Sequence, residues 1–334
     1  MQPVFKFHPI YKERPWGGQA IAGLGSHRSA PEGRKIGESW ELSDRPGDES
    51  IIAEGEFTGR TIRWLLDEHG EFVMGQPWPK GRRFPLLIKI LDCAERLSLQ
   101  VHPPAAAAAA LGGEPKTEMW YLLDAGPNAA LMAGLRKGTR REDFEAALRS
   151  QTLEKLVHRI PIKKDQAMFI PSGRIHAIDA GCLILEIQQN SDTTYRVYDW
   201  GRVGLDGKPR ELHIEQSLRC VNFQDFEPAL IAPEGSHPGR KTFISCEHFT
   251  VISMHATEEE SAVEGTAAVH LIDGVVEICS GAEGVTTALG RGETALLSAV
   301  PHHIHTRTGR AGVILAYCRG GGTRSPAGSH GPAE

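Results

Sequence analysis

The stretch that decides the fold reads Leu97-Ser98-Leu99-Gln100-Val101-His102-Pro103. Aliphatic and polar residues alternate along it. On a β-strand the aliphatic side chains therefore share one face, and Ser98, Gln100 and His102 share the other. A polar row opposite an aliphatic row indicates a β-barrel whose interior carries a site.

Short runs of the same kind recur along the chain, separated by many of its 37 glycines and 21 prolines. They are rich in Val, Ile, Leu, Phe and Thr, which favours strands. In the first part of the chain we predict strands at Phe84–Ile90, Leu97–Val101, Met119–Leu123, Ala167–Ile170, Leu183–Gln188 and Thr194–Tyr198. Many short strands between turns indicate an antiparallel sandwich or barrel rather than alternating β and α units.

Helices are the minority in this reading. Thr139-Arg140-Arg141-Glu142 has the form of a capping box, which predicts a small helical insertion near residues 139–160. A short helix is also predicted at Ala105–Leu111, after two prolines and before Gly112-Gly113.

A second β-rich block begins near Lys241, beyond a linker rich in Pro, Gly and Ser at Pro228–Gly239. Its predicted strands are Phe249–Met254, Ala267–Ile272, Val275–Ile278, Glu293–Leu297 and Gly312–Tyr317. We therefore predict a first domain at residues 1–235, a smaller β domain at residues 236–319 and a disordered tail at residues 320–334.

Bulk properties narrow the classes of partner. The chain has 334 residues and a net charge of −5, so a general affinity for nucleic acid is not expected. No apolar run approaches the length of a membrane span. The N-terminus has no signal-peptide pattern, and the six cysteines show no CxxC spacing. We expect a cytoplasmic protein that binds neither nucleic acid nor membrane.

Polar residues with metal-binding potential lie on several predicted strands. Lys116 and Glu118 share a strand face, and the turn signal Pro171-Ser172-Gly173 predicts that His176 stands at the start of a strand. Two histidines, a carboxylate and an amide oxygen suit Zn²⁺, although iron or manganese would also tolerate them. Nothing in the periodicity brings His176 near His102, so each residue alone also fits a structural role.

Longer motifs carry a family resemblance along nearly the whole chain. They are Arg14-Pro15-Trp16-Gly17-Gly18, residues 36–41 (IGESWE), residues 97–103 (LSLQVHP), residues 116–121 (KTEMWY), residues 171–177 (PSGRIHA) and residues 186–199 (EIQQNSDTTYRVYD). In their order and separation the chain resembles a class I mannose-6-phosphate isomerase of the short bacterial type.

The resemblance implies two cupin barrels, that is, double-stranded β-helix or jelly-roll barrels, and one Zn²⁺ per chain. It places the metal on His102, Glu118 and His176, usually joined by Gln100. The family's active-site arginine maps onto Arg196, and its cation beside the metal glutamate maps onto Lys116. The implied reaction interconverts mannose 6-phosphate and fructose 6-phosphate through an enediol-type intermediate.

Further roles follow from what this chemistry needs. Glu186 is our candidate for acid–base work, with an orienting role as the alternative. Lys116 is expected to share the proton work or balance charge, and Arg196 to stabilise the intermediate or grip the substrate. Ser98, Arg202 and Lys208 are our candidates for binding the phosphate, together with Arg210.

Two other classes of function share this pattern. A non-catalytic cupin that binds a sugar or regulates transcription would keep the barrel, and a metal-dependent cupin enzyme could act on another substrate with a similar ligand set. Metal content combined with turnover of mannose 6-phosphate separates these possibilities.

Overall fold

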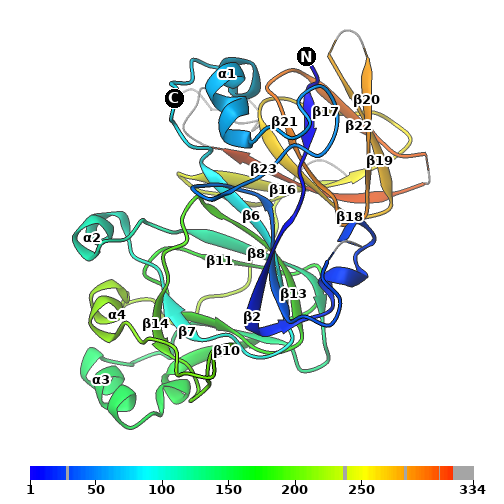
Figure 1. Cartoon of the computed structure of the whole chain (residues 1–334). Coiled ribbons are helices and arrows are strands. Elements are labelled where there is room, and N and C mark those ends of the chain that lie inside the picture. The colour runs from blue at the N-terminus through cyan, green and yellow to red at the C-terminus, as the bar shows by residue number, and fades with distance from the viewer. Residues whose placement is uncertain (28–29, 236–238, 282–283, 308, 319–334) are drawn as a thin grey trace, which may run out of the picture.

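The structure is a computed structural model that describes residues 1–27, 30–235, 239–281, 284–307 and 309–318. Its strands pair antiparallel and form two neighbouring barrels, with small helices outside them (Figure 1). The predicted all-β class with two cupin barrels is confirmed. The predicted tail at residues 320–334 lies outside the described residues.

Two facing sheets form the first barrel. One has five strands in the order β10 (Val157–Pro161), β9 (Ala130–Leu135), β12 (His176–Ile178), β7 (Leu99–Val101) and β14 (Tyr195–Tyr198). The other has six, in the order β11 (Ala167–Ile170), β8 (Glu118–Ala125), β13 (Cys182–Gln189), β6 (Leu86–Cys93), β3 (Ile36–Leu42) and β2 (Ile10–Gly18). A short hairpin of β4 (Asp44–Arg45) and β5 (Asp48–Glu49) follows β3.

The second barrel has the same two-sheet plan. Its larger sheet runs β1 (Val4–Lys6), β21 (Thr294–Leu297), β18 (Ala267–Asp273), β23 (Ala311–Cys318), β16 (Phe249–Ala256) and β15 (Arg240–Ser245). Its smaller sheet runs β17 (Ser261–Val263), β22 (His302–His305), β19 (Val275–Ser280) and β20 (Val285–Gly290). Strand β1 thus crosses from the N-terminus into this barrel, where Val4 pairs with Leu297. The division at residues 235 and 236 stays a prediction.

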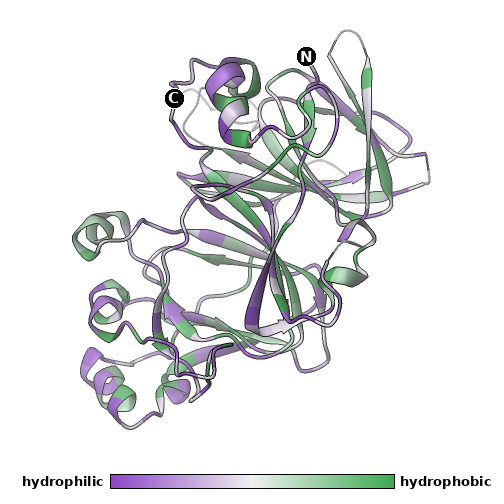
Figure 2. Ribbon diagram, viewed as in Figure 1, coloured by the Kyte–Doolittle hydropathy of each residue, from purple (hydrophilic) through white to green (hydrophobic). Residues whose placement is uncertain are grey.

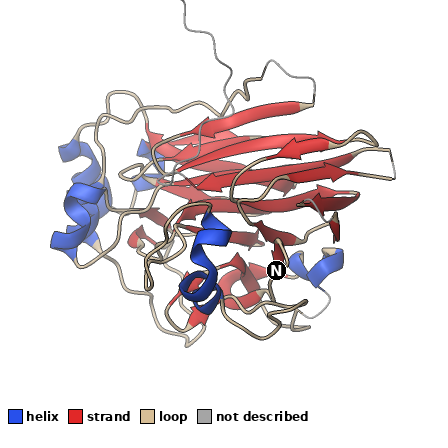
Figure 3. Ribbon diagram, turned by 90° about the horizontal axis from the view of Figure 1, so that it is seen from above, coloured by secondary structure: helices blue, strands red, loops and turns tan. Residues whose placement is uncertain are grey.

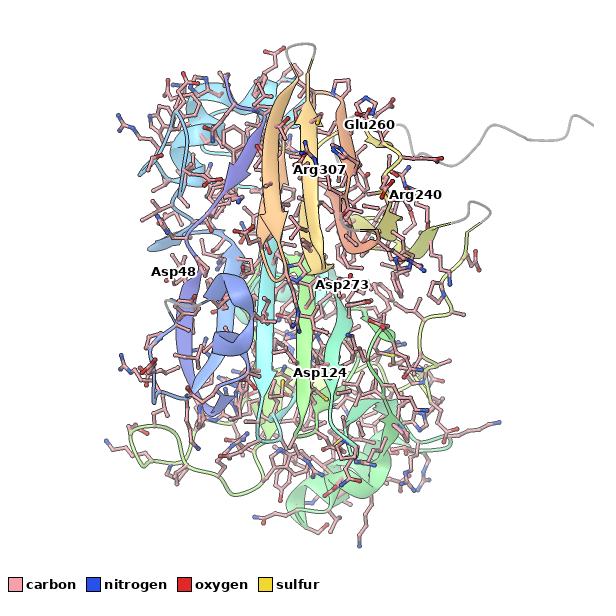
Figure 4. The ribbon with its side chains drawn as sticks, turned by 90° about the vertical axis from the view of Figure 1, so that its right-hand side faces the viewer. Asp48, Asp124, Arg240, Glu260, Asp273 and Arg307 are labelled. Atoms are coloured by element: carbon pink, nitrogen blue, oxygen red, sulfur yellow. The ribbon has the colours of Figure 1, made fainter. Side chains whose placement is uncertain are left out.

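The barrels meet through their six-stranded sheets. One hydrophobic cluster joins Leu42, Ile88 and Leu185 of the first barrel to Val251 and Ile314 of the second. Seen from above, the sheets stack in layers with the helices outside them (Figure 3). Hydrophobic residues concentrate on the strands (Figure 2), whereas charged residues such as Asp124, Glu260 and Arg307 lie on the outer surface (Figure 4).

The central strands of the first barrel are buried on both faces. On β13, Leu183, Leu185 and Ile187 pack into the core between the barrels. Ile184 and Cys182 face the barrel interior, and Glu186 follows on that same face. The same alternation on β6 and β8 puts polar side chains inside this barrel.

The two predicted helices are present with different ends, and the structure adds two helices that were not predicted, at Ile62–Met74 and Ile214–Cys220. The helices are α1 (Ile62–Met74), α2 (Ala105–Ala108), α3 (Arg141–Arg149) and α4 (Ile214–Cys220), with 3₁₀ turns η1 (Ile21–Gly23), η2 (Gly25–His27), η3 (Ala109–Leu111) and η4 (Leu153–Leu156). The capping box of α3 lies one residue later than predicted, because the carboxylate of Asp143 accepts the backbone N–H of Arg140 at 3.1 Å. No described helix has the length and hydrophobicity to cross a membrane.

Strands β2 and β3 contain a bulge that shapes the barrel mouth. Both Glu13 and Gly18 pair with Ile36, so the residues between them leave the ladder. Gly17 then passes so close to β3 that a Cβ atom would lie 2.4 Å from the backbone nitrogen of Gly37. Only glycine permits this approach.

We expect Gly17→Ala to destabilise the protein by about 1–3 kcal/mol, because the clash is with backbone atoms that cannot rotate away. Thermal unfolding checks this. Gly23→Ala is the matched control, because a Cβ there meets nothing within 4 Å. Equal melting temperatures for the two variants would contradict the role assigned to this close approach.

Candidate metal centre

Three strand ends bring the predicted metal ligands together. His102 follows the last residue of β7, Glu118 begins β8 and His176 begins β12. His176 pairs with Gln100 of β7 across the five-stranded sheet, while Glu118 comes from the facing six-stranded sheet. The ligand atoms of His102, Glu118 and His176 lie within 4.8 Å of one another, and all three residues are buried.

Hydrogen bonds fix how the two imidazoles present themselves. Nδ1 of His102 lies 2.9 Å from the carbonyl oxygen of Thr193, and Nδ1 of His176 lies 2.9 Å from that of Arg174. A carbonyl only accepts, so each Nδ1 carries the proton and each Nε2 presents a lone pair. The Nε2 atoms of His102 and His176 lie 3.4 and 3.7 Å from oxygens of Glu118.

Two acceptor atoms of this group lack hydrogen-bond donors. Nε2 of His102 and Oε1 of Glu118 are buried and have no hydrogen-bond partner among the described residues. Lone pairs and a carboxylate that converge in this way repel one another unless a cation lies between them. The residues present therefore fit a divalent metal ion.

Protonation favours the same conclusion. Burial lowers the pKa of His102, helped by the charge of Lys116, and burial lowers the pKa of His176 to about 3. Burial alone would raise the pKa of Glu118, but Lys116 at 2.8 Å and His102 hold it well below its ordinary value. At neutral pH the group thus offers two neutral imidazoles and a carboxylate.

Gln100 borders the group through its amide. Its Nε2 lies 3.2 Å from Nε2 of His176, and Ser98 Oγ lies 3.5 Å from its Oε1. The amide nitrogen thus faces the histidine, and a half-turn of the amide would bring the oxygen there instead. Gln100 has the reach of a fourth ligand.

A cavity of about 600 Å³ opens beside this group. Its volume lies within the range of about 300–1,000 Å³ that is usual for small-molecule sites. Of the residues predicted from the sequence, those that line it are Ser98, Gln100, Lys116, Glu186, Arg196 and Arg210. The predicted phosphate ligands Arg202 and Lys208 are not among the lining residues.

Glu186 lies inside the barrel, and its position explains its pKa. Trp120 Nε1 donates to Glu186 Oε1 at 3.1 Å, and Lys89 Nζ lies 3.5 Å from Oε2. Burial and the charge of Glu118 raise the pKa of Glu186, against Lys116 and Lys89. For Lys116 burial favours the neutral amine, yet the charges of Glu118 and Glu186 prevail and raise its pKa.

Several lining residues carry no role in the sequence analysis. Arg14 donates to both oxygens of Glu38, at 2.8 and 3.1 Å. Lys89 lies 3.6 Å from Asp192 and 4.9 Å from the ring centre of Trp40. The signal for Lys89 was visible in the sequence, because it is a lone charge inside the apolar run at residues 84–90.

Arginines surround one carboxylate at the far side of the cavity. Asp199 is 5% exposed, and it accepts from Arg210 at 2.7 and 2.5 Å and from Arg202 Nη2 at 2.7 Å. Arg202 also donates to the carbonyl of Arg96, which holds it outside the cavity lining. Arg196 donates to the carbonyl of Glu211 at 2.8 Å, and its Nε is buried with no hydrogen-bond partner in the part of the chain that the structure describes.

Known proteins resemble this chain in sequence and in structure. Residues 4–126 match the family model of the phosphomannose isomerase type I catalytic domain. The mannose-6-phosphate isomerase ManA of Bacillus subtilis is 36% identical over 258 residues, which cover 75% of this chain and 78% of that protein. The mannose-6-phosphate isomerase of Streptococcus mutans is 37% identical over 254 residues, with the same coverage of both chains.

A solved structure agrees with this match. The crystal structure of the mannose 6-phosphate isomerase from Bacillus subtilis superposes with a TM-score of 0.84 at 31% identity, covering 95% of this chain and all of that one. A zinc-bound mannose 6-phosphate isomerase superposes with a TM-score of 0.73 at 18% identity, which shows the shared fold.

The Glu38 ion pairs predict a loss of stability in acid. Burial opposes the charge of Glu38, but Lys89 and Arg14 lower its pKa to about 2. Its contribution is therefore full above about pH 4.5 and disappears as the pH falls towards 2, an effect of about 3 kcal/mol. We expect Glu38→Gln to lower the free energy of unfolding of the metal-stripped protein at pH 7 and to make that free energy depend less on pH.

Urea unfolding at pH 7 and pH 3 measures both effects. Glu68→Gln is the control, since that carboxylate forms an exposed ion pair with Lys80. If Glu38→Gln and Glu68→Gln shift the urea unfolding curves alike at both pH values, the buried ion pairs of Glu38 add nothing to the free energy of unfolding.

Proposed function

The chain belongs to the type I phosphomannose isomerase family, and from this membership we propose that it interconverts mannose 6-phosphate and fructose 6-phosphate. The observation that carries the proposal is the His102–Glu118–His176 group, which Gln100 and Lys116 connect to a polar cavity that both of them line. A pure sugar-binding module would need neither a metal-binding group nor buried acid–base residues beside it.

We propose Zn²⁺ as the bound metal, with Nε2 of both histidines and an oxygen of Glu118 as ligands and Gln100 as a weaker fourth. The donor set supports zinc, and a mannose 6-phosphate isomerase of the same fold is a zinc-bound protein. The ion would supply Lewis-acid stabilisation of charge on a sugar oxygen.

The protein's own groups would move the proton between C1 and C2. Glu186 is the proposed base, since it lines the cavity and is oriented by the Trp120 indole. Lys116 lines the same wall beside Glu118, where it would donate a hydrogen bond to the oxygen on which charge develops. A buried carboxylate and a buried ammonium within one cavity form the acid–base pair that isomerisation needs.

Arg196 would stabilise the enediol-type intermediate or hold the substrate. It lies on β14, lines the cavity and pairs in the strand register with Gln100 of β7. Ser98 lies directly before β7, two residues from Gln100, and would donate to the substrate. A cytoplasmic location is part of the proposal, supported by six cysteines that are all free.

Loss of a metal ligand should remove metal and activity together. We expect His102→Ala and Glu118→Ala each to lower metal affinity by more than about 100-fold, because a two-residue site cannot replace a three-residue one. Metal analysis of purified protein and an assay on mannose 6-phosphate measure this.

His303→Ala, at an exposed histidine of the second barrel, is the matched control. Retained zinc in both ligand variants would contradict the ligand assignment. Fully metal-loaded wild-type protein without turnover would contradict the isomerase proposal itself.

Arg196→Ala should separate metal binding from catalysis. We expect it to keep its metal and to lose about 100-fold or more in kcat/KM, because it removes a cation from the reaction site and no metal ligand. Arg219→Ala removes an exposed arginine of α4 and serves as the control. Near-normal activity of Arg196→Ala would exclude it from the mechanism.

A further inference from the structure

The cavity has two electrostatically different walls. On one wall the cations are already matched: Arg14 by Glu38, Lys89 by Glu38, Glu186 and Asp192, and Lys116 by Glu118. A phosphate dianion placed there would meet several carboxylates at close range. This wall suits a cation and the hydroxyl groups of a sugar.

The other wall is formed by Arg196 and Arg210. Together with Arg202 they surround a single buried carboxylate, Asp199. The other acidic groups nearby are exposed: Asp206 accepts the backbone N–H of Lys208 in its own turn, and the side chain of Glu211 is 82% exposed. Three partly buried arginines thus face one buried carboxylate on this side, and the excess of positive charge favours an anionic ligand.

Arg210 is held in place before any ligand arrives. Its Nε and Nη2 bind the two oxygens of Asp199, and Nη1 takes no part in that pair of bonds. A fork held in this way loses little conformational freedom when it binds a ligand, and a guanidinium matches the geometry of phosphate.

We propose that Arg210 contacts the phosphate group of the substrate and that Asp199 positions it there. The proposal rests on the proposed function, because it assumes that the ligand is a sugar phosphate. It changes the phosphate site predicted from the sequence: Arg202 supports the wall from behind, Lys208 lies outside it, and Arg210 is the residue that meets the ligand.

The place of Asp199 in the fold explains how one carboxylate can hold the arginines in position. It follows the last residue of β14, so the strand that carries Arg196 also fixes Asp199. Arg202 reaches from Asp199 to the carbonyl of Arg96, which joins the cluster to the chain just before β7. The same pairs of bonds thus tie the arginine wall to the strand that bears Gln100.

The first test compares Arg210→Ala with the wild type and with Arg219→Ala, an exposed arginine on α4 that matches the change in charge. We expect KM for mannose 6-phosphate to rise by about 10- to 100-fold in Arg210→Ala, with kcat changed by less than about threefold. The inhibition constant of inorganic phosphate should rise in parallel. A KM and a phosphate inhibition constant equal to those of Arg219→Ala would overturn the contact.

The second test uses Asp199→Asn, which keeps the shape of the side chain and removes its charge. A positioning role predicts a raised KM at nearly unchanged kcat per bound metal, and a weaker inhibition by inorganic phosphate. Asp199→Glu, which restores the carboxylate, should recover part of the loss. A lower kcat at wild-type KM in Asp199→Asn would show that Asp199 is merely structural. It would overturn the proposal that Asp199 positions Arg210.

Calorimetry separates this inference from the proposed reaction. Wild-type protein should bind fructose 6-phosphate much more tightly than fructose, and Arg210→Ala should lose most of that preference. If wild-type protein shows the preference but no turnover, the isomerase proposal fails while the phosphate contact stands. If wild-type protein converts mannose 6-phosphate and Arg210→Ala still prefers fructose 6-phosphate over fructose, the phosphate contact is contradicted while the isomerase proposal stands.

Discussion

A fully buried carboxylate, Glu118, imposes the arrangement of the first barrel. A lone carboxylate away from water would bind a proton, so its charge must be matched on the spot. Lys116 supplies one positive charge at 2.8 Å, and the neutral imidazoles of His102 and His176 leave space and lone pairs for a metal ion. The backbone carbonyls of Thr193 and Arg174 then orient the imidazoles. Segments that are far apart in the sequence are thus held together around Glu118.

The two barrels share a plan and differ in what fills them. The second barrel is packed with aliphatic side chains such as Val269, Ile278 and Val313. The first keeps polar groups on the inner faces of β6, β8 and β13, and each finds a partner of opposite charge. Because the outer faces of these strands are buried against the other barrel, every second residue must be apolar. The second barrel thus serves as the support that keeps the charged strands in register.

Alternation and motif spacing predicted much of this from the sequence. The runs predicted as strands all contain strands, His176 begins one as expected, and the helix after Pro103-Pro104 ends at Gly112. Strands β2 and β3 escaped notice because glycine and charged residues interrupt them, and their pairing is bulged. Parity placed Gln100 with His102, yet only the folded sheet brings His176 opposite Gln100. The arginines were the hardest to assign, because Arg202 and Arg210 look equivalent in sequence. Only the folded chain shows that Arg202 is bound to the carbonyl of Arg96, whereas Arg210 lines the cavity.

The pairing of β1 with β21 has a consequence for how the molecule forms. Lys6 and Glu293 are 287 residues apart in sequence and in contact across this pair. During synthesis the first strand must wait, unpaired, until nearly the whole chain has emerged. The first barrel can assemble in the meantime, since its strands lie between the two partners. Closing such a long loop is slow compared with local pairing, so completion of the second barrel is expected to be the late step of folding.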